Sequence, residues 1–274
     1  MTGSATRHRS AIGAAPRLAL GAALAIVAAV SAGCAASLPD CAPGSAGCTS
    51  ILFLGNSYTY VNDLPSTFDQ LAASGGHPLH TQMVANGGET LMQHAASTDS
   101  NDAIASLSWN FVVLQEQSET PATDYGRQEM ATGAHALAVK AQGVGARTLL
   151  FMTPAHRDGS PDAGMPTYQS MQWAIDEGYV QVGRRLDLAI VPAGYAWFML
   201  HQQHPEIVLW QDDGSHPTVA GTYLEACVFY DSIFHRASKG LAFADGLSRD
   251  EAQTVQSTAD DNVLPNLSTY GLDF

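Results

Sequence analysis

Apolar and polar positions alternate in blocks along the chain from residue 50 onward. Short apolar runs rich in β-branched and aromatic residues are separated by longer stretches in which apolar residues recur every three or four positions. The first pattern predicts buried strands and the second predicts amphipathic helices. Strands are expected at 51–55, about 81–85, 111–115, 148–153 and 187–192. Helices are expected at roughly 64–74, 91–106, 125–142, 167–183, 194–204 and 218–238, with a short helix and an irregular end after 247.

This alternation of strands and helices predicts the fold class α/β. We expect a three-layer α/β/α sandwich with a mostly parallel sheet of roughly five strands. Residues 50–274 contain no internal repeat and are expected to form one domain. In sheets of this kind, ligands bind outside the carboxyl ends of the strands. The polar residues that follow each strand are therefore the first candidates for chemistry.

The N-terminal 33 residues have a different pattern. Three arginines precede the apolar run LALGAALAIVAAV (18–30), and small residues then lead to Cys34. This order predicts an export signal over residues 1–33. Thirteen apolar residues are short for a membrane span, which needs about 20. The stretch VSAGC resembles the lipobox of bacterial lipoproteins and implies a lipid on Cys34, but Ser31 replaces the usual branched aliphatic residue, so cleavage by an ordinary signal peptidase is the alternative.

Residues 34–49 are small and turn-forming, and we expect a flexible tether there. Cys41 and Cys48 flank a loop that is short enough to be closed by a disulfide, which an exported protein can keep. Cys227 lies in an apolar helical pattern, YLEACVFYDSIF, and is expected to be a buried free thiol. The cysteines do not have the spacing of a zinc site.

Composition and charge exclude several classes of protein. The chain is 46% hydrophobic and 14% charged, which suits a globular domain and not a disordered or fibrous protein. Its formal charge is −14, and removal of the three basic residues of the signal would bring it to −17. This acidity argues against binding to nucleic acid or to an anionic membrane through a basic patch. Membrane attachment is expected only through a lipid on Cys34.

The first predicted strand, in ILFLGNSYTY (51–60), ends with a glycine, an asparagine and Ser57. Ser57 stands where a helix is expected to start, so its hydroxyl would lie at the carboxyl edge of the sheet beside unpaired backbone N–H groups. Those N–H groups can stabilise an oxyanion, which makes Ser57 a candidate nucleophile. The alternative is that Ser57 only caps the helix. Because Thr59 follows two positions later, the G-x-S-x-G elbow of the α/β-hydrolases is absent.

A serine nucleophile needs a base and a group that orients the base. In WQDDGSHPTVAG (210–221), Asp213 lies three residues before His216, in a turn just ahead of a predicted helix. One loop can therefore carry both the carboxylate and the imidazole. The alternative is an ordinary turn followed by a helix cap.

Two further polar clusters follow predicted strands. VANGGETL (84–91) contains Gly87 and Gly88, whose backbone can approach a bound group closely. FVVLQEQSETP (111–121) contains Gln115 and Gln117, whose amides can donate hydrogen bonds to an oxyanion. Each cluster could also be a simple turn or a polar strand end.

The order of these four clusters resembles that of the SGNH (GDSL-type) hydrolases. The stretches FLGNSYT, ANGGET and DGSHP are similar to the first, second and last blocks of that superfamily. The resemblance covers about residues 51–240 and implies a flavodoxin-like sheet. It also implies Ser57 as nucleophile, Asp213 and His216 as its partners, and an oxyanion hole formed by the N–H groups of Ser57 and Gly88, with Gly87 as the alternative.

The third block departs from the superfamily pattern. G-x-N-D is missing and LQEQS stands in its place, which resembles a variant branch with such a block. In this interpretation Gln117 replaces the asparagine donor, with Gln115 as the second choice. A longer amide has more rotamers, which would lower the preorganisation of the oxyanion hole.

These observations predict an exported serine esterase, either secreted or a surface lipoprotein, that removes small acyl groups from a small-molecule or polysaccharide ester. Acetyl groups on a carbohydrate are what the resemblance and the export signal suggest. No cofactor or metal is required. The main alternative is an inactive surface lipoprotein that binds carbohydrate on the same fold, and a phosphoesterase is a weaker one.

Other polar residues have two interpretations each. His201 and His204 have a spacing that could bind a metal, but no acidic cluster of ligand spacing is nearby. His156 and Arg157 follow the fourth predicted strand, where they could contact substrate or lie in a solvated loop. Glu116 could be an acid on the substrate side or a partner of Arg157.

Overall fold

The structure is a computed structural model, and it describes residues 41–274. The predicted export signal, the first part of the tether and Cys34 lie outside the described residues. In the described part, no helix is both long enough and apolar enough to cross a membrane.

Five parallel strands form one sheet in the order β2-β1-β3-β4-β5. They are β1 (Thr49–Gly55), β2 (Leu79–Ala85), β3 (Phe111–Leu114), β4 (Arg147–Phe151) and β5 (Ala189–Val191). This is the flavodoxin-like order, with β1 next to the point where the direction of winding reverses. The predicted fold class and all five predicted strands are confirmed.

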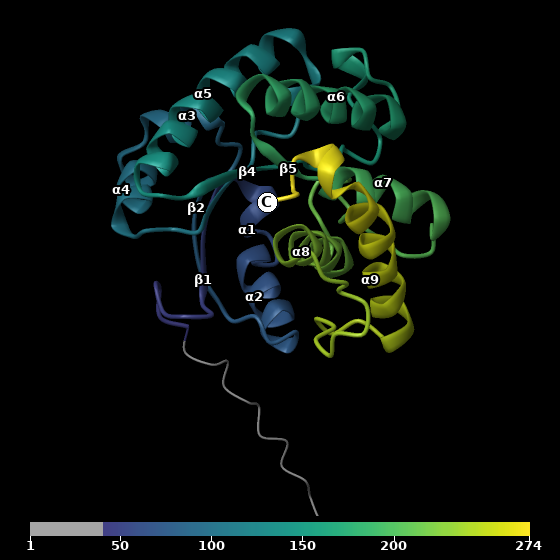
Figure 1. Cartoon of the computed structure of the whole chain (residues 1–274). Coiled ribbons are helices and arrows are strands. Elements are labelled where there is room, and N and C mark those ends of the chain that lie inside the picture. The colour runs from purple at the N-terminus through teal and green to yellow at the C-terminus, as the bar shows by residue number, and fades with distance from the viewer. Residues whose placement is uncertain (1–40) are drawn as a thin grey trace, which may run out of the picture. The chain divides into compact units, whose positions relative to one another are not determined.

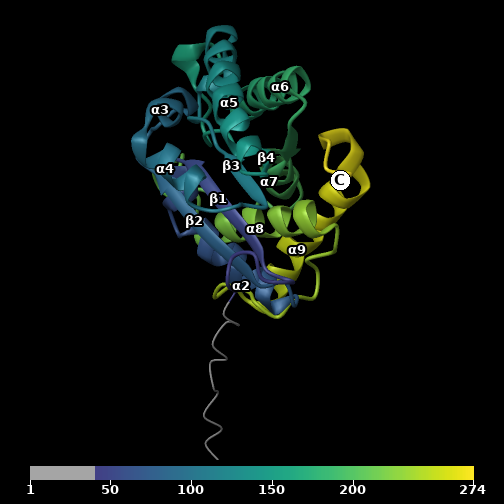
Figure 2. The ribbon, with the colours of Figure 1, turned by 60° about the vertical axis from the view of Figure 1, so that its left-hand side comes forward.

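Helices cover both faces of the sheet, as Figures 1 and 2 show. The helices α3 (Leu91–Ala96), α4 (Thr98–Ser106), α5 (Asp124–Gly143) and α6 (Tyr168–Leu186) pack on one face. The opposite face is covered by α2 (Leu64–Ser74) and α8 (Val219–Phe234), and α9 (Arg249–Val263) packs against α8. The helix α7 (Ala193–Gln203) contacts α6, α8 and α9, and the short α1 (Ser57–Tyr60) follows β1.

The sequence explains both the core and the starts of the helices. The run of four apolar residues at 51–54 in β1 is completely buried, as expected of a parallel strand covered on both faces. Phe53 packs edge-on against Phe229 of α8, with ring centroids 5.4 Å apart. Most helices begin after a serine, threonine, aspartate or asparagine whose side chain accepts from a backbone N–H of the first turn.

Three helical predictions differ from the structure. The helix expected at 91–106 is divided at Ser97, which ends α3 and caps α4 through a hydrogen bond to the N–H of Ser100. The tail forms the fifteen-residue α9 and a 3-10 turn, Leu264–Tyr270, instead of a short helix and an irregular end. The four-residue α1 begins at Ser57, where a helix start is expected, although the apolar periodicity predicts its first helix only from residue 64.

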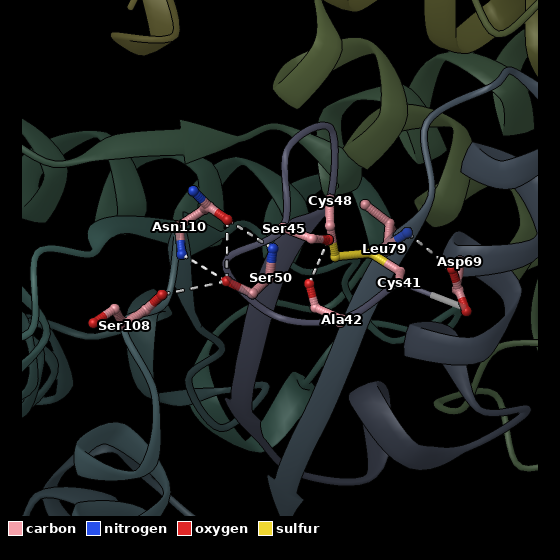
Figure 3. The surroundings of a disulfide bond; sticks show 9 residues. All are labelled: Cys41, Ala42, Ser45, Cys48, Ser50, Asp69, Leu79, Ser108 and Asn110. Atoms are coloured by element: carbon pink, nitrogen blue, oxygen red, sulfur yellow. Dashed lines mark hydrogen bonds between the residues drawn. A yellow bond between two sulfur atoms is a disulfide. The ribbon is translucent and has the colours of Figure 1, made fainter. Parts of the chain in front are cut away.

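Cys41 and Cys48 form a disulfide ahead of β1, with their Cα atoms 5.4 Å apart (Figure 3). The closed loop leads directly into β1, where Ser50 exchanges hydrogen bonds with Asn110 at the start of β3. This end of the sheet lies opposite the carboxyl ends of the strands. Cys227 is a fully buried free thiol, which confirms the expectation for this residue.

Candidate active site

Ser57 is the first residue of α1, at the carboxyl end of β1. The cap of this helix is Asn56, whose side-chain oxygen accepts from the N–H of Tyr58 at 3.2 Å. Ser57 itself is half-buried, whereas Asn56 is 2% exposed. The strand–helix junction therefore presents the Ser57 hydroxyl from a buried and fixed backbone.

Gln115 holds this junction from the end of β3. Its Oε1 accepts from the backbone N–H of Asn56 at 2.8 Å and from Thr59 Oγ1 at 3.0 Å. Its Nε2 donates to Asn56 Oδ1 at 2.9 Å and to the Glu116 carbonyl. Both amide hydrogens of Gln115 are engaged in these hydrogen bonds, so its side chain stabilises the junction between β1 and α1. The alternative that Gln115 donates to an oxyanion is therefore not supported.

The close packing of the Gln115 and Thr59 side chains against β1 explains the glycine at position 55. A Cβ atom on Gly55 would lie 2.3 Å from Thr59 Oγ1 and 2.6 Å from Gln115 Oε1. Real Cβ contacts of this length do not occur, so a larger residue at position 55 would displace the Gln115 side chain from Asn56. Gly55 is thus required by the neighbours that position Ser57.

His94 of α3 holds the same junction from another side. It is completely buried, and its Nε2 lies 2.8 Å from the Gly55 carbonyl oxygen, to which it donates. Its Nδ1 lies 2.8 Å from Ser100 Oγ. Burial lowers the pKa of His94, which favours the neutral ring. No local pattern indicated this residue, because the contact joins positions 39 residues apart.

Asp213 and His216 form the hydrogen bond that their spacing predicts. His216 Nδ1 lies 2.7 Å from Asp213 Oδ2, and Asp213 Oδ1 accepts from the N–H groups of Ser215 and His216 at 2.9 and 3.0 Å. The bond to the His216 imidazole, followed by these backbone bonds, lowers the pKa of Asp213 to about 2. The carboxylate is therefore ionised at neutral pH and fixes the orientation of the ring.

Helix α1 and the loop that carries this pair are joined by several contacts. Tyr58 is buried, its hydroxyl lies 3.1 Å from Ser215 Oγ, and its ring centroid lies 6.0 Å from that of His216. Asn62 Nδ2 donates to the Pro217 carbonyl at 2.9 Å and to Thr222 Oγ1 at 3.0 Å. The fold therefore brings Ser57 and the Asp213–His216 pair to one region. The hydrogen bonds of residues 41–274 do not include one between Ser57 and His216, and such bonds are often formed only when substrate is bound.

Gly88 lies in an exposed turn next to α1. Its φ of +69° is a left-handed conformation that glycine adopts without strain, whereas Gly87 has no positive φ. Asn56 Nδ2 donates to the Glu89 carbonyl at 3.0 Å and holds this turn against the junction. Among the hydrogen bonds of the described residues, the N–H groups of Ser57 and Gly88 have no acceptor. Both N–H groups are free to donate to an oxyanion, and their place in an oxyanion hole remains a prediction.

Gln117 is fixed by its own oxygen. Oε1 accepts from the N–H groups of Glu119 and Thr120 at 2.9 and 3.1 Å and from Thr120 Oγ1 at 3.1 Å. Nε2 donates to Ser118 Oγ at 3.2 Å, which leaves one amide hydrogen for another acceptor. The extra rotamer freedom expected of glutamine is therefore removed by the turn that it caps. Its role as the third oxyanion donor is a prediction.

Glu116 does not pair with Arg157, so that alternative is wrong. It is completely buried and accepts from the N–H of Gln117 at 2.7 Å and from that of Leu91, the first residue of α3. Arg157 pairs with Asp158 at 3.0 Å. Burial raises the pKa of Glu116 to about 7. Its carboxyl group ties the second block to the third.

The histidines considered for a metal site have other contacts. His204 Nδ1 lies 3.1 Å from Glu206 Oε1, and His201 packs edge-on against Trp210 with ring centroids 4.9 Å apart. Within residues 41–274, no group of three or more histidine, cysteine, aspartate or glutamate side chains could hold a metal ion.

Comparisons with known proteins identify solved hydrolase structures with a similar fold. Neither a protein-family model nor a curated protein sequence matches the chain. Among solved structures, it is similar to a candidate SGNH hydrolase from Slackia heliotrinireducens, with 27% identity, a TM-score of 0.56, and coverage of 67% of this chain and 98% of that one.

Two other structures have a similar fold at lower identity. A DUF4886 family protein from Bacteroides uniformis is 16% identical, with a TM-score of 0.66 and coverage of 80% of this chain and 96% of that one. An acetylxylan esterase from Geobacillus stearothermophilus is 16% identical, with a TM-score of 0.51 and coverage of 73% and 97%. The parallel sheet and the similarity to the Slackia heliotrinireducens structure, at 27% identity, confirm the resemblance to the SGNH hydrolase superfamily.

Proposed function

We propose that this protein is a serine esterase with Ser57 as nucleophile, His216 as general base and Asp213 as the residue that orients the imidazole. The observation that carries the proposal is the 2.7 Å hydrogen bond between His216 Nδ1 and Asp213 Oδ2, in a loop joined to the helix that Ser57 begins. With its proton on Nδ1, His216 has an unprotonated Nε2 that can accept the proton of a hydroxyl. The similarity to solved esterase structures supports ester hydrolysis.

The reaction proceeds in two steps. Ser57 Oγ attacks the ester carbonyl carbon while His216 Nε2 takes the hydroxyl proton, and the carbonyl oxygen becomes an oxyanion. The N–H groups of Ser57 and Gly88 and the amide of Gln117 donate to that oxyanion. His216 then protonates the leaving alcohol, and a water molecule attacks the acyl-enzyme in the same way. Asp213 stabilises the imidazolium that forms in each step.

The proposed substrates are small acyl esters, with acetyl groups on a carbohydrate as the first class to test. The acetylxylan esterase among the similar structures supports this class. The protein is proposed to be exported and either secreted or held at the cell surface by a lipid on Cys34. The acidic composition disfavours nucleic acid as a partner.

The first experiment measures acetate release from 4-nitrophenyl acetate by the purified protein and by Ser57→Ala and His216→Ala. Each variant is expected to lose about a thousandfold or more in kcat, as removal of a triad member does. His135→Ala, an exposed histidine of α5, is the matched control. If the wild-type protein is no faster than the two variants, the esterase proposal is wrong. Retained binding of an acetylated saccharide by Ser57→Ala would then favour the carbohydrate-binding alternative.

A further inference from the structure

A second imidazole lies beside the proposed triad and is not used by it. His156 follows β4, and its Nε2 lies 3.1 Å from the hydroxyl of Ser118, which is 7% exposed. On the other side of the ring, Nδ1 lies 3.9 Å from Glu119 Oε1. This distance is too long for a hydrogen bond. The ring therefore has one occupied nitrogen and one nitrogen that faces a carboxylate across a gap.

The backbone around His156 is fixed on three sides. The N–H of Ala155 donates to Gln172 Oε1 at 2.7 Å, and Trp210 Nε1 donates to the Ala155 carbonyl at 2.9 Å. On the other side of His156, the N–H of Arg157 donates to the Gly214 carbonyl at 2.7 Å. Gly214 directly follows Asp213, so His156 is attached to the loop that carries the proposed base. His156 is therefore held in a fixed position, whereas Arg157 next to it is exposed.

The hydrogen-bond network is compatible with a proton on Nδ1 of the His156 ring. Two backbone N–H groups donate to Gln117 Oε1, so the other atom of that amide is the nitrogen, which donates to Ser118 Oγ. The Ser118 hydroxyl keeps its own hydrogen, which it can donate to His156 Nε2. In that arrangement the neutral ring carries its proton on Nδ1, directed at Glu119. Burial lowers the pKa of His156, which favours this neutral form at pH 7.

We propose that His156 Nδ1–H and Glu119 Oε1 together bind one hydroxyl group of the alcohol part of the substrate. This inference rests on the proposed esterase function and deepens it, because it makes the site selective for esters of polyols and sugars. Two hydrogen bonds of about 2.8 Å that meet at one oxygen atom join groups roughly 4.0 to 4.6 Å apart, for angles at that oxygen from about 90° to about 110°. The observed separation of 3.9 Å lies at the short end of that range.

The chemistry of the pair fits a hydroxyl group better than other small groups. A hydroxyl accepts one hydrogen bond and donates another, and this pair offers one donor and one acceptor. The side chain of His156 is 24% exposed and that of Glu119 is 44% exposed, so the pair is accessible. An ester without such a hydroxyl would leave both polar groups without that partner, which is how a polar site rejects an analogue that lacks the group.

The test compares two acetates, one with hydroxyl groups and one without. The kcat/KM for a monoacetylated methyl xyloside is divided by that for 4-nitrophenyl acetate, for the wild-type protein, His156→Phe and Glu119→Gln. This ratio is expected to fall about tenfold in each variant, mainly through KM for the sugar ester. His204→Phe and Glu206→Gln, which alter an exposed histidine–glutamate pair after α7, are the matched controls and are expected to keep the wild-type ratio.

The double variant sharpens the test. If one hydroxyl bridges both side chains, His156→Phe combined with Glu119→Gln lowers the ratio no further than the more severe single variant. An unchanged ratio in both single variants would overturn the proposal. Equal losses on both acetates would also overturn it, since they would mean that the pair positions the triad.

A binding measurement distinguishes failure of the esterase function from failure of the proposed hydroxyl-binding pair. If the wild-type protein hydrolyses neither acetate, the proposed function fails, and unesterified methyl xyloside is titrated into the wild-type protein and Glu119→Gln with NMR detection. Binding that is lost in Glu119→Gln supports the hydroxyl-binding pair. Binding that is absent in the wild-type protein, or equal in the two proteins, overturns it.

Discussion

The two halves of the proposed catalytic machinery are built in opposite ways. The nucleophile side, around Ser57, is held by the buried side chains of His94, Gln115 and Asn56, which come from three different elements. The base side is a single exposed loop in which Asp213 and His216 contact each other directly. Substitutions on the base side should therefore change activity alone. Substitutions on the nucleophile side should change stability as well.

The largest expected effect is on the base side. Asp213→Asn would remove the acceptor that fixes the His216 tautomer, so kcat should fall about 10³- to 10⁴-fold. The melting temperature should stay within about 2 °C, because exposed substitutions rarely change the free energy of unfolding by more than ~0.5 kcal/mol. Asp212→Asn changes the neighbouring exposed carboxylate and is the control. A melting temperature that falls together with kcat would contradict the proposed contrast.

The second effect is the pH dependence of stability, which has opposite signs on the two sides. Glu116, on the buried side, has a pKa raised to about 7, so the folded state binds a proton that the unfolded state releases near its usual pKa of 4.5. Its contribution is full below about pH 4.5 and is lost as the pH rises through about 7, by ~3 kcal/mol at most. Asp213 has a pKa lowered to about 2, so its small contribution is present above 3.8 and is lost as the pH falls through 2.

Glu116→Gln tests this dependence, because glutamine resembles the protonated carboxyl group. Urea unfolding between pH 5 and 8 should give a free energy of unfolding that falls less with pH in the variant than in the wild-type protein. Asp102→Asn, which alters an exposed aspartate of α4, serves as the control. Parallel pH profiles for wild type and Glu116→Gln would show that Glu116 is ionised across this range.

The third effect is steric and lies on the nucleophile side. Gly55→Ala would force Gln115 and Thr59 away from the junction, and we expect it to lower the free energy of unfolding by about 1–3 kcal/mol. Activity should fall at the same time, since Asn56 and Ser57 would move. Gly143→Ala, at the end of α5, meets no atom within 4 Å and is the matched control. Unfolding in denaturant measures the free energy of unfolding, and the esterase assay measures the activity. Wild-type values of both for Gly55→Ala would contradict the proposed role of Gln115 at this junction.

The smallest effect concerns the link between the two sides. Asn62→Gly would remove the bonds to Pro217 and Thr222 while keeping the left-handed φ of 57° at this position. The loss should be about 1 kcal/mol in the free energy of unfolding and severalfold in kcat. Asp187→Gly, at an exposed position after α6 that also has a left-handed φ, of 55°, is the matched control. Unchanged kcat in Asn62→Gly would mean that Tyr58 alone joins the two sides.

The strands, most of the helices and the Asp213–His216 pair could be predicted from the sequence. These features depend on residues close together in the chain: apolar runs make buried strands, polar caps start helices, and a three-residue spacing lets one loop hold a carboxylate and an imidazole. Local sequence could not tell which of the two glutamines stabilises the junction and which one is free to donate a hydrogen bond. Gln115 and Gln117 are two positions apart in the chain. Only the fold brings Gln115 into hydrogen-bond contact with Asn56, which lies 59 residues away.

The supporting contacts of the site depend on tertiary packing and could not be predicted from the sequence. His94, Glu116 and His156 act on residues from other elements, and a single sequence does not record which elements become neighbours. The order of strands in the sheet brings those elements together. Local spacing thus specified which side chains could react, whereas the packing of the sheet and its helices fixed their surroundings.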